Sequence, residues 1–333
     1  MSEKKEFTVS DKAIKILNNS TVWDMTLPWD PEAMDEITLP RFKKAGFDFI
    51  SLTVDMPSLE ATVQHIAKVH SFIRTNGDKI AFARNVGDID KAKETGKLAV
   101  TFHLQETNPL NGDINMISTY YELGVRHMLL AYNQKNRVGD GCAERGDGGL
   151  SRFGVKVVQE MNRVGMLVDG SHTGYRTTME AMEVSNSPFI FSHCNAWGVV
   201  PHYRNIKDDQ IKACADTGGV IGVNGLGEFL DDPSASSESV FKHIDYMVDL
   251  VGPQHVGIGL DYVKHTTSFW NWVRKNPEIW PLINNKPHAD TKFGQPEQIK
   301  ELCELMIKHQ YAESDISAIL GDNFARVARQ VWK

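Results

Sequence analysis

Cysteines are few in this sequence, and they lie far apart. Only four occur among 333 residues, and no two of them form a CxxC pair: Cys142, Cys194, Cys214 and Cys303. A disulfide framework or a zinc knuckle needs paired or closely spaced cysteines, so we expect neither. Widely separated free thiols are typical of a reducing compartment, and we therefore expect a cytoplasmic location.

Long apolar runs and an excess of positive charge are also missing. No stretch approaches the roughly 18 apolar residues of a membrane helix, and the polar first six residues lack the apolar core of a signal peptide. The formal net charge is −7, whereas proteins that bind nucleic acids usually present a basic face. We expect neither a membrane nor a nucleic acid as partner.

The sequence has no GxGxxG motif opening a first helix and no Walker A motif, which argues against a doubly wound nucleotide-binding sheet. It does contain short β-branched runs that alternate with longer amphipathic segments, the pattern of repeated βα units. Eight runs are predicted as strands: Thr21–Asp24, Phe47–Val54, Leu98–Leu104, His127–Tyr132, Met166–Asp169, Phe189–Ser192, Val220–Val223 and Val256–Leu260. Eight is the strand number of an α/β TIM barrel, (β/α)₈, and Ile80–Ala83 is a possible ninth, accessory strand.

The segment Val155–Val164 illustrates the helical pattern, because its apolar residues recur at spacings of one, three and three. Gly165 follows where a C′ glycine would end that helix. No linker or repeat divides the chain. We expect one barrel domain over residues 1–333, with a polar N-terminal extension over about residues 1–18.

A glycine-rich stretch, Arg137–Gly154, follows the fourth predicted strand of the barrel. It is either a flexible surface loop or, since loops after barrel strands build active sites, part of a substrate pocket.

Three polar residues stand at or just after the ends of predicted buried strands: His172, His193 and Asp261. Strand ends at one face of a barrel converge, and imidazole together with carboxylate suits Zn²⁺ or a similar divalent ion. A strand-end histidine is often only a hydrogen-bonded core residue. Spacing alone leaves both interpretations open.

Several sequence blocks resemble, in the right order, those of the membrane (renal) dipeptidases of the amidohydrolase superfamily. The resemblance covers nearly the whole chain and includes the glycine loop, both histidine blocks, the last strand and the C-terminal helix: Gly149–Gly154, Val157–His172, Phe191–Ala196, Arg204-Asn205, Val256–Asp261 and Gly321–Val327.

This resemblance implies a barrel with a two-zinc centre that hydrolyses dipeptides, and a homodimer. It implies that His172 and His193 ligate the second metal ion and that Asp261 takes and returns a proton. Arg204 would pair with the carboxylate of a dipeptide, a task suited to a planar guanidinium.

The departures from the family pattern concern the first metal ion. The family's first strand ends in His-x-Asp, where this chain has Asp24-Met25-Thr26, and the metal-bridging glutamate aligns with Gln105. Neutral oxygen ligands are poor for Zn²⁺. We therefore expect a single zinc ion, held by His172, His193 and Asp24, and a substrate contacted by Arg204, Gln105 and Asn133. The histidine that polarises the scissile carbonyl aligns near Tyr132, which can donate a hydrogen bond to an oxyanion.

Three further residues are candidates to replace the lost ligands. His103 shares a strand face with Gln105 but would lie one layer deeper, which favours a buried, hydrogen-bonded role. Asp55 follows the second strand and either enters the pocket or forms a turn before Met56-Pro57. Glu106 would project away from the face of Gln105, in a supporting role.

The aromatic residues after the last strand have two interpretations. Packing is favoured over a ligand cage, and a subunit interface is a further use of such a cluster: Phe269, Trp270, Trp272 and Trp280.

Three functions are consistent with these patterns. The first is a metal-dependent hydrolase of a dipeptide or a similar small amide that carries a carboxylate. The second is a non-catalytic barrel that binds a small carboxylated ligand. The third is a hydrolase of the same fold that acts on a cyclic amide or a lactone.

Overall fold

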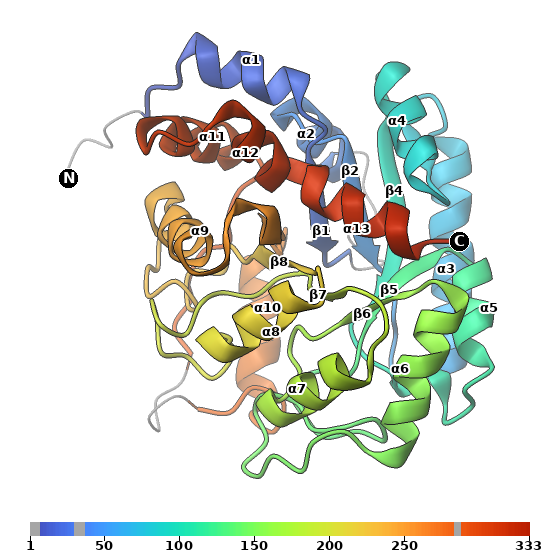
Figure 1. The fold of residues 1–333 in the computed structure, drawn as a ribbon. Coiled ribbons are helices and arrows are strands. Elements are labelled where there is room, and N and C mark those ends of the chain that lie inside the picture. Colours follow the sequence, from blue (N-terminus) through green and yellow to red (C-terminus); the bar gives the residue numbers. More distant parts are fainter. Residues whose placement is uncertain (1–6, 30–36, 283–287) are drawn as a thin grey trace.

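The computed structural model describes residues 7–29, 37–282 and 288–333, and within them eight parallel strands follow one another around a nearly closed barrel (Figure 1). They are β1 Trp23–Leu27, β2 Phe49–Thr53, β4 Leu98–Leu104, β5 Val125–Leu129, β6 Leu167–Asp169, β7 Phe189–Phe191, β8 Val220–Val223 and β9 Val256–Ile258. A further strand, β3 (Ile80–Phe82), pairs with β4 outside this path. The predicted (β/α)₈ barrel with an accessory strand is confirmed.

The strands are apolar runs because the barrel buries both of their faces. The first and last strands are joined by a side chain, since Asp24 Oδ1 of β1 accepts a hydrogen bond of 3.2 Å from the backbone N–H of Leu260, just after β9. The same oxygen accepts from the N–H of Thr26 at 3.0 Å.

Most predicted strand boundaries lie within two residues of the observed ones, and two strands, β1 and β5, end three residues from the predicted position. The first strand was expected over Thr21–Asp24 but runs over Trp23–Leu27, because pairing with β2 continues to Leu27 across an irregularity after Asp24. The strand expected over His127–Tyr132 is Val125–Leu129.

The shift of β5 also has a physical cause. Gly124 turns the chain with a φ of 107°, and the next residue, Val125, pairs at once with Phe102 of β4. Tyr132 and Asn133 therefore lie in the loop after β5, where Asn133 has a φ of 58°.

Helices surround the barrel (Figure 1). They are α1 Asp11–Asn19, α2 Thr38–Ala45, α3 Leu59–Thr75, α4 Val86–Glu94, α5 Met116–Glu122, α6 Arg152–Val164, α7 Tyr175–Val184, α8 Asp208–Asp216, α9 Ser237–Val251, α10 Thr266–Lys275, α11 Gln298–Lys308, α12 Glu313–Ser317 and α13 Asn323–Val331, with short turns η2 Asn108–Leu110, η3 Pro253–His255 and η4 Ala318–Asp322. The helix predicted over Val155–Val164 is α6, which Ser151 caps at its start and Gly165 ends with a φ of 92°.

Helix α1 occupies much of the segment expected as a polar N-terminal extension. Its inner residues Ala13, Ile16 and Leu17 are buried in the core, while its outer face is exposed. Ser10 caps the helix and donates two hydrogen bonds to Glu304 of α11. Residues 1–6 lie outside the described residues.

Helix α13 closes the amino ends of the strands. Its apolar face, which includes Phe324 and Val327, packs with the first residues of several strands, among them Trp23, Phe49 and Val220. With the amino ends covered, the carboxyl ends of the strands remain as the face on which a site can form.

A separate apolar cluster lies in the loops that follow strands β8 and β9: Leu226, Phe229, Trp270, Val273, Trp280 and Phe293. Trp270 and Trp280 are buried within it, which confirms packing as the role of these two aromatic residues, whereas Trp272 is 41% exposed.

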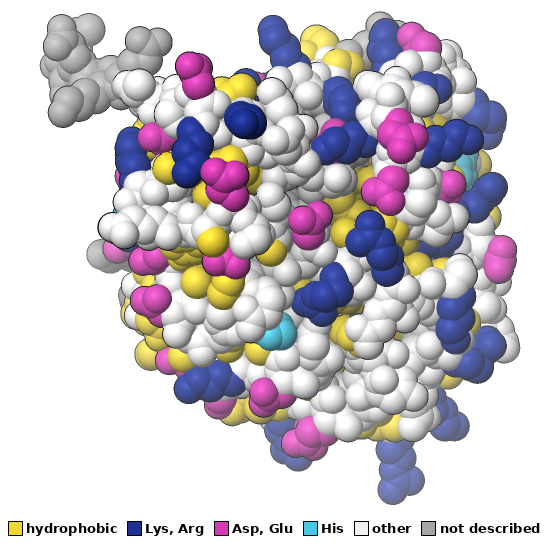
Figure 2. All heavy atoms as spheres, turned by 45° about the horizontal axis from the view of Figure 1, so that its top comes forward, with side chains coloured by type: hydrophobic (Ala, Val, Ile, Leu, Met, Phe, Trp, Pro, Cys, Tyr) yellow, Lys and Arg dark blue, Asp and Glu magenta, His cyan; other side chains and the backbone are white. Residues whose placement is uncertain are grey.

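On the face shown in Figure 2, basic and acidic side chains are interspersed, and apolar side chains come to the surface only in small areas. Within the described part of the chain, no helix combines the length and the apolar character needed to cross a bilayer.

Candidate functional site

The candidate residues gather at the carboxyl ends of the strands, as the sequence predicted. Three of them, Asn133, His172 and Asp261, have φ values between 56° and 61°, a left-handed conformation that is rare outside glycine. Such backbone conformations cost free energy and are common at functional sites, where the surrounding structure holds them in place.

The two histidines face one another, with ring centroids 5.2 Å apart. Asn133 Oδ1 lies 2.7 Å from Nδ1 of His172, and because this oxygen only accepts, the Nδ1 atom carries the proton. Nδ1 of His193 lies 3.0 Å from the Thr26 hydroxyl and 2.7 Å from that of Ser192. Burial, and then the positive charge of Arg204, hold the pKa of both imidazoles well below the usual value. Both rings are therefore neutral at pH 7.

Two carboxyl groups lie near this pair. Burial raises the pKa of Asp24 to about 7, and the negative charge of Asp261 also raises it. Hydrogen bonds from the backbone N–H groups of Thr26 and Leu260 act in the opposite direction. Burial also raises the pKa of Asp261 to about 6, opposed by Arg204 and by a hydrogen bond of 3.0 Å from Asn224. A carboxylate with a pKa close to neutrality is suited to taking and returning a proton.

Tyr132 stacks on His172 with ring centroids 4.0 Å apart, and burial raises the pKa of its phenol, which stays protonated. Arg204 is only 2% exposed. Its Nη1 donates to Cys194 Sγ at 3.0 Å and its Nη2 to the carbonyl oxygen of His193 at 2.9 Å, while its buried Nε has no partner. The guanidinium is thus held by two of its five N–H donors, and its Nε–H remains for a ligand.

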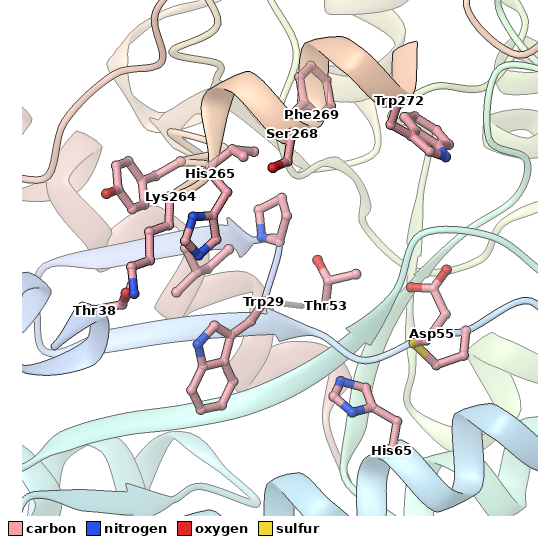
Figure 3. A pocket seen from close by; sticks show the side chains of 15 residues that line it. Trp29, Thr38, Thr53, Asp55, His65, Lys264, His265, Ser268, Phe269 and Trp272 are labelled. Atoms are coloured by element: carbon pink, nitrogen blue, oxygen red, sulfur yellow. The ribbon is translucent and has the colours of Figure 1, made fainter. Parts of the chain in front are cut away.

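Cavities lie on two sides of these residues. A cavity of about 190 Å³ is lined by His172 and Arg204, together with Cys142 and Gly141 from the glycine-rich loop. The loop after β5 thus contributes to a pocket. A larger cavity of about 380 Å³ lies by the loops after β1, β2 and β9, and Asp55 lines it (Figure 3). Asp55 therefore enters a pocket, the alternative to a turn-forming role.

Gln105 is joined to this second cavity by two hydrogen bonds. Its backbone N–H donates to Asp55 Oδ1 at 2.8 Å, and its side-chain Nε2 donates to the Thr53 hydroxyl at 3.2 Å. Glu106 points elsewhere, where its carboxylate accepts a hydrogen bond from Asn108, and burial followed by the charge of Asp55 raises its pKa to about 7.

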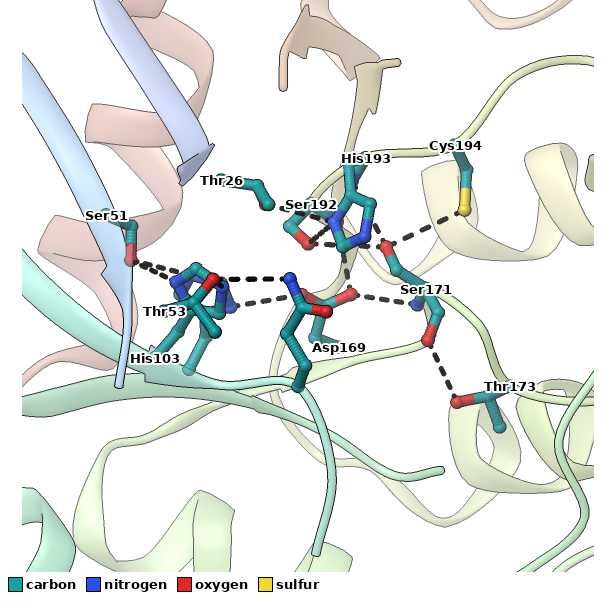
Figure 4. Close-up of polar contacts among 12 residues, drawn as sticks. Thr26, Ser51, Thr53, His103, Asp169, Ser171, Thr173, Ser192, His193 and Cys194 are labelled. Atoms are coloured by element: carbon teal, nitrogen blue, oxygen red, sulfur yellow. Dashed lines mark hydrogen bonds and ion pairs between the residues drawn. The ribbon is translucent and has the colours of Figure 1, made fainter. Parts of the chain in front are cut away.

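A chain of hydrogen bonds, partly buried near Gln105 and fully buried beyond His103, runs through the barrel (Figure 4). Its links are Gln105 Nε2 to Thr53 Oγ1, Thr53 Oγ1 to His103 Nε2 (2.9 Å), His103 Nδ1 to Ser51 Oγ (3.0 Å), Ser51 Oγ to His127 Nε2 (2.9 Å) and His127 Nδ1 to Asp169 Oδ2 (3.0 Å). His103 is accordingly a buried, hydrogen-bonded core residue, as the sequence favoured.

Asp169 sets the direction of this chain. A carboxylate only accepts, so a neutral His127 carries its proton on Nδ1 and accepts from Ser51 at Nε2. By the same logic Ser51 accepts from His103, His103 accepts from the Thr53 hydroxyl, and Thr53 accepts from the amide of Gln105. The carbonyl oxygen of Gln105 is then turned away from Thr53.

Asp169 also fixes the two histidine-bearing loops. Its Oδ1 accepts from the backbone N–H of Ser171 at 2.9 Å and of Ser192 at 3.1 Å, the residues just before His172 and His193. Burial alone would raise the pKa of this carboxyl, but the hydrogen bonds that it accepts, above all the one from His127, outweigh burial and lower the pKa to about 2. Asp169 and His127 were not predicted as site residues, although both lie within predicted strands.

The donors fit a metal ion only in part. Nε2 of His193 and Oδ2 of Asp24 are buried polar atoms without a hydrogen-bond partner, and a cation would satisfy such atoms. Over residues 7–29, 37–282 and 288–333, however, no three His, Cys, Asp or Glu side chains form a ready-made metal-binding group. The imidazoles of His172 and His193 fit as two ligands, with positions left for water or substrate.

The barrel, with histidines and carboxyl groups gathered at the carboxyl ends of its strands, is of the amidohydrolase type. The family model for membrane dipeptidases (peptidase family M19) matches residues 44–333, and the chain belongs to this family of metallopeptidases. The resemblance seen in the sequence is confirmed.

Individual relatives agree with this assignment. A dipeptidase of Clonostachys rogersoniana, verJ, is 33% identical over 239 residues, which cover 71% of this chain and 61% of that protein. The chain thus spans under two thirds of the length of this curated relative. A solved amidohydrolase structure from Pseudomonas aeruginosa is 30% identical, with a TM-score of 0.84 over 96% of this chain and 99% of the other.

A further solved structure shares the fold. It is a metallopeptidase from Rhodobacter sphaeroides liganded with a phosphinate mimic of the dipeptide L-Ala-D-Ala, 18% identical, with a TM-score of 0.77 over 94% of this chain and 99% of that one.

Proposed function

We propose that this protein is a metal-dependent hydrolase of a dipeptide or a similar small amide with a free carboxylate, and that it works with one zinc ion. The observation that carries the proposal is the pair of buried, neutral imidazoles, His172 and His193, beside Asp24 and Asp261 at the carboxyl ends of the strands. The single-ion proposal is supported by Thr26 and Gln105, which stand where the family has metal ligands.

His172, His193 and Asp24 would hold the ion. Zinc supplies a water of lowered pKa and polarises the scissile carbonyl. Asn133 keeps the proton of His172 on Nδ1, so that its Nε2 presents a lone pair. To present its Nε2 as a ligand, His193 would donate from Nδ1 to the hydroxyl of Thr26 or of Ser192, both of which can accept.

The remaining residues would handle protons and substrate. Asp261, with a pKa of about 6, is mostly ionised at pH 7 and takes the proton of the attacking water, then returns it to the leaving amine. Tyr132 donates its phenolic proton in a hydrogen bond to the developing oxyanion. Arg204 binds the substrate carboxylate, and the amides of Asn133 and Gln105 orient the peptide group.

A second candidate is a barrel that binds a small carboxylated ligand without catalysis. It is favoured by the absence of a complete three-ligand group among the described residues and by Thr26 and Gln105, which stand where the family has metal ligands. Hydrolysis of a cyclic amide or a lactone would use the same residues.

We further propose one domain over residues 1–333, a cytoplasmic location and a homodimer. The location is supported by the four cysteines, all of which are free thiols. The dimer follows from the family resemblance.

The experiment is metal analysis of the purified protein after loading with zinc and dialysis, combined with assays on a dipeptide panel. We expect one ion per chain and dipeptide turnover in the wild type, and neither in His193→Ala. His309 is exposed on the surface, so the control His309→Ala should keep both. Two tightly held ions would contradict the single-ion proposal. No ion and no turnover, with dipeptide binding retained, would favour the non-catalytic barrel.

A further inference from the structure

The cavity of about 380 Å³ is large enough for a bulky side chain, and most of its wall is apolar (Figure 3). Its apolar and aromatic lining includes Leu27, Trp29, Met56, Val263, Phe269 and Trp272. Ligand pockets are of this size and typically combine an apolar wall with a few polar groups that fix orientation.

The cavity adjoins the proposed reaction centre. Leu27 follows Thr26, whose hydroxyl contacts His193, and Tyr262 follows Asp261. Thr53, also in the wall, holds the side-chain amide of Gln105. His172 and Arg204 line the smaller cavity instead, so the two cavities flank the residues proposed to act on the peptide bond.

Asp55 provides a negative charge in the larger cavity. Its Oδ1 is held by the backbone N–H of Gln105, which fixes the orientation of the carboxylate. Burial raises its pKa to about 6, although backbone hydrogen bonds lower it in part. No cationic side chain of the described residues contributes to this shift. Lys264 also lines the cavity, but Figure 3 shows it well apart from Asp55. An ionised carboxylate in such a place favours a cationic ligand group.

We infer that this cavity binds the N-terminal residue of the substrate, with the free ammonium group on Asp55 and a large apolar or aromatic side chain against the aromatic wall. The inference rests on the proposed function and names its substrate class. A dipeptide with its carboxylate at Arg204 extends across the centre and places its other end on the side of Asp55. A cation beside Trp or Phe rings gains a further favourable contact.

The first test compares the dipeptides Phe-Gly and Ala-Gly. Burial of the larger side chain should raise kcat/KM by about tenfold to a hundredfold in the wild-type enzyme. Trp272→Ala should reduce this preference by about tenfold. The matched control is Trp197→Ala, which removes a similarly exposed tryptophan from the other cavity and should leave the Phe-to-Ala ratio unchanged.

The second test concerns the ammonium group. The wild-type enzyme should prefer Phe-Gly over N-acetyl-Phe-Gly by at least about tenfold, the effect of one charge-assisted contact. Asp55→Asn should abolish this preference, because asparagine keeps an oxygen for the N–H of Gln105 but loses the charge. A flat response to side-chain size, or equal cleavage of the acetylated peptide, would overturn the inference.

Calorimetry on the zinc-free protein separates this inference from the proposed function. Tighter binding of Phe-Gly than of Ala-Gly, weakened in Trp272→Ala, would support the cavity assignment even if no peptide were hydrolysed. Turnover of dipeptides without selectivity in rate or binding would refute the cavity assignment and leave the proposed function intact.

Discussion

Replacing Asp169 by asparagine should weaken the fold and the site together. The carboxylate of Asp169 accepts hydrogen bonds from His127, Ser171 and Ser192 inside the barrel. Asparagine retains one acceptor oxygen but loses the charge, and the loss of a buried hydrogen bond to a charged group costs up to about 3 kcal/mol of unfolding free energy. We expect Asp169→Asn to be less stable than the wild type by this amount at pH 6.

The pH dependence follows from the lowered pKa. The carboxyl has an ordinary pKa near 3.8 and a pKa of about 2 in the fold, which corresponds to about 2 kcal/mol of stability. Because the pKa is depressed, this stability is complete above about pH 4 and is lost as the pH falls through about 2. The difference in unfolding free energy between the wild type and Asp169→Asn should therefore become smaller by about 1 kcal/mol as the pH falls from 6 to 3.

Urea unfolding at a series of pH values measures this gap. Asp216→Asn, at an exposed position in α8, is the control and should keep a constant gap to the wild type. A gap for Asp169→Asn that stays constant or widens as the pH falls would refute the reasoning. Nitrogen NMR of the histidines gives a second measure, since the variant should move the protons of His103 and His127 from Nδ1 to Nε2.

Three further substitutions test other parts of the molecule. Burial, with the charge of Asp55, raises the pKa of Glu106 to about 7, so its ionisation opposes folding as the pH rises from about 4.5 through 7. In urea unfolding, Glu106→Gln should be as stable as the wild type at pH 4. At pH 8 it should be more stable by about 1 kcal/mol, a value reduced to account for the partial exposure of Glu106. Equal stability at pH 8 would contradict this. Gly259→Ala would place a methyl group 1.9 Å from the carbonyl oxygen of Ser192 and should cost about 3 kcal/mol in thermal unfolding, whereas Gly146→Ala, in open space, should be neutral. Trp270→Ala removes a fully buried side chain and should cost about 3 to 5 kcal/mol by the same measurement; a loss under about 1 kcal/mol would mean that the cluster does not stabilise the fold.

The sequence was sufficient to predict the barrel because each strand is buried on both faces and so appears as a short apolar run between helical segments. The strand boundaries were less accessible. The end of β1 depends on pairing with β2 across an irregularity, and the start of β5 depends on pairing with β4 immediately after Gly124. These are contacts between distant segments, which local composition does not encode.

Some residues of the site could likewise be located from the sequence, and others could not. His172, His193 and Asp261 could be located because each stands near a predicted strand end, where parallel strands converge. The chain of hydrogen bonds from Asp169 to Gln105 could not, because it depends on the register of neighbouring strands, which decides that His103 lies opposite His127. For Asp55 the sequence left two alternatives open, a turn before Met56-Pro57 or a place in the pocket, because only the fold brings it against Gln105.

The left-handed backbone of Asn133, His172 and Asp261 has a practical consequence for mutagenesis. Alanine at these positions would remove the functional group and still strain the main chain, whereas glycine adopts such angles freely and relieves about 1 kcal/mol. Asp261→Gly is therefore the cleaner deletion, since the loop can keep its path while the carboxylate is lost. Comparing the glycine and alanine variants at one position separates loss of chemistry from loss of shape.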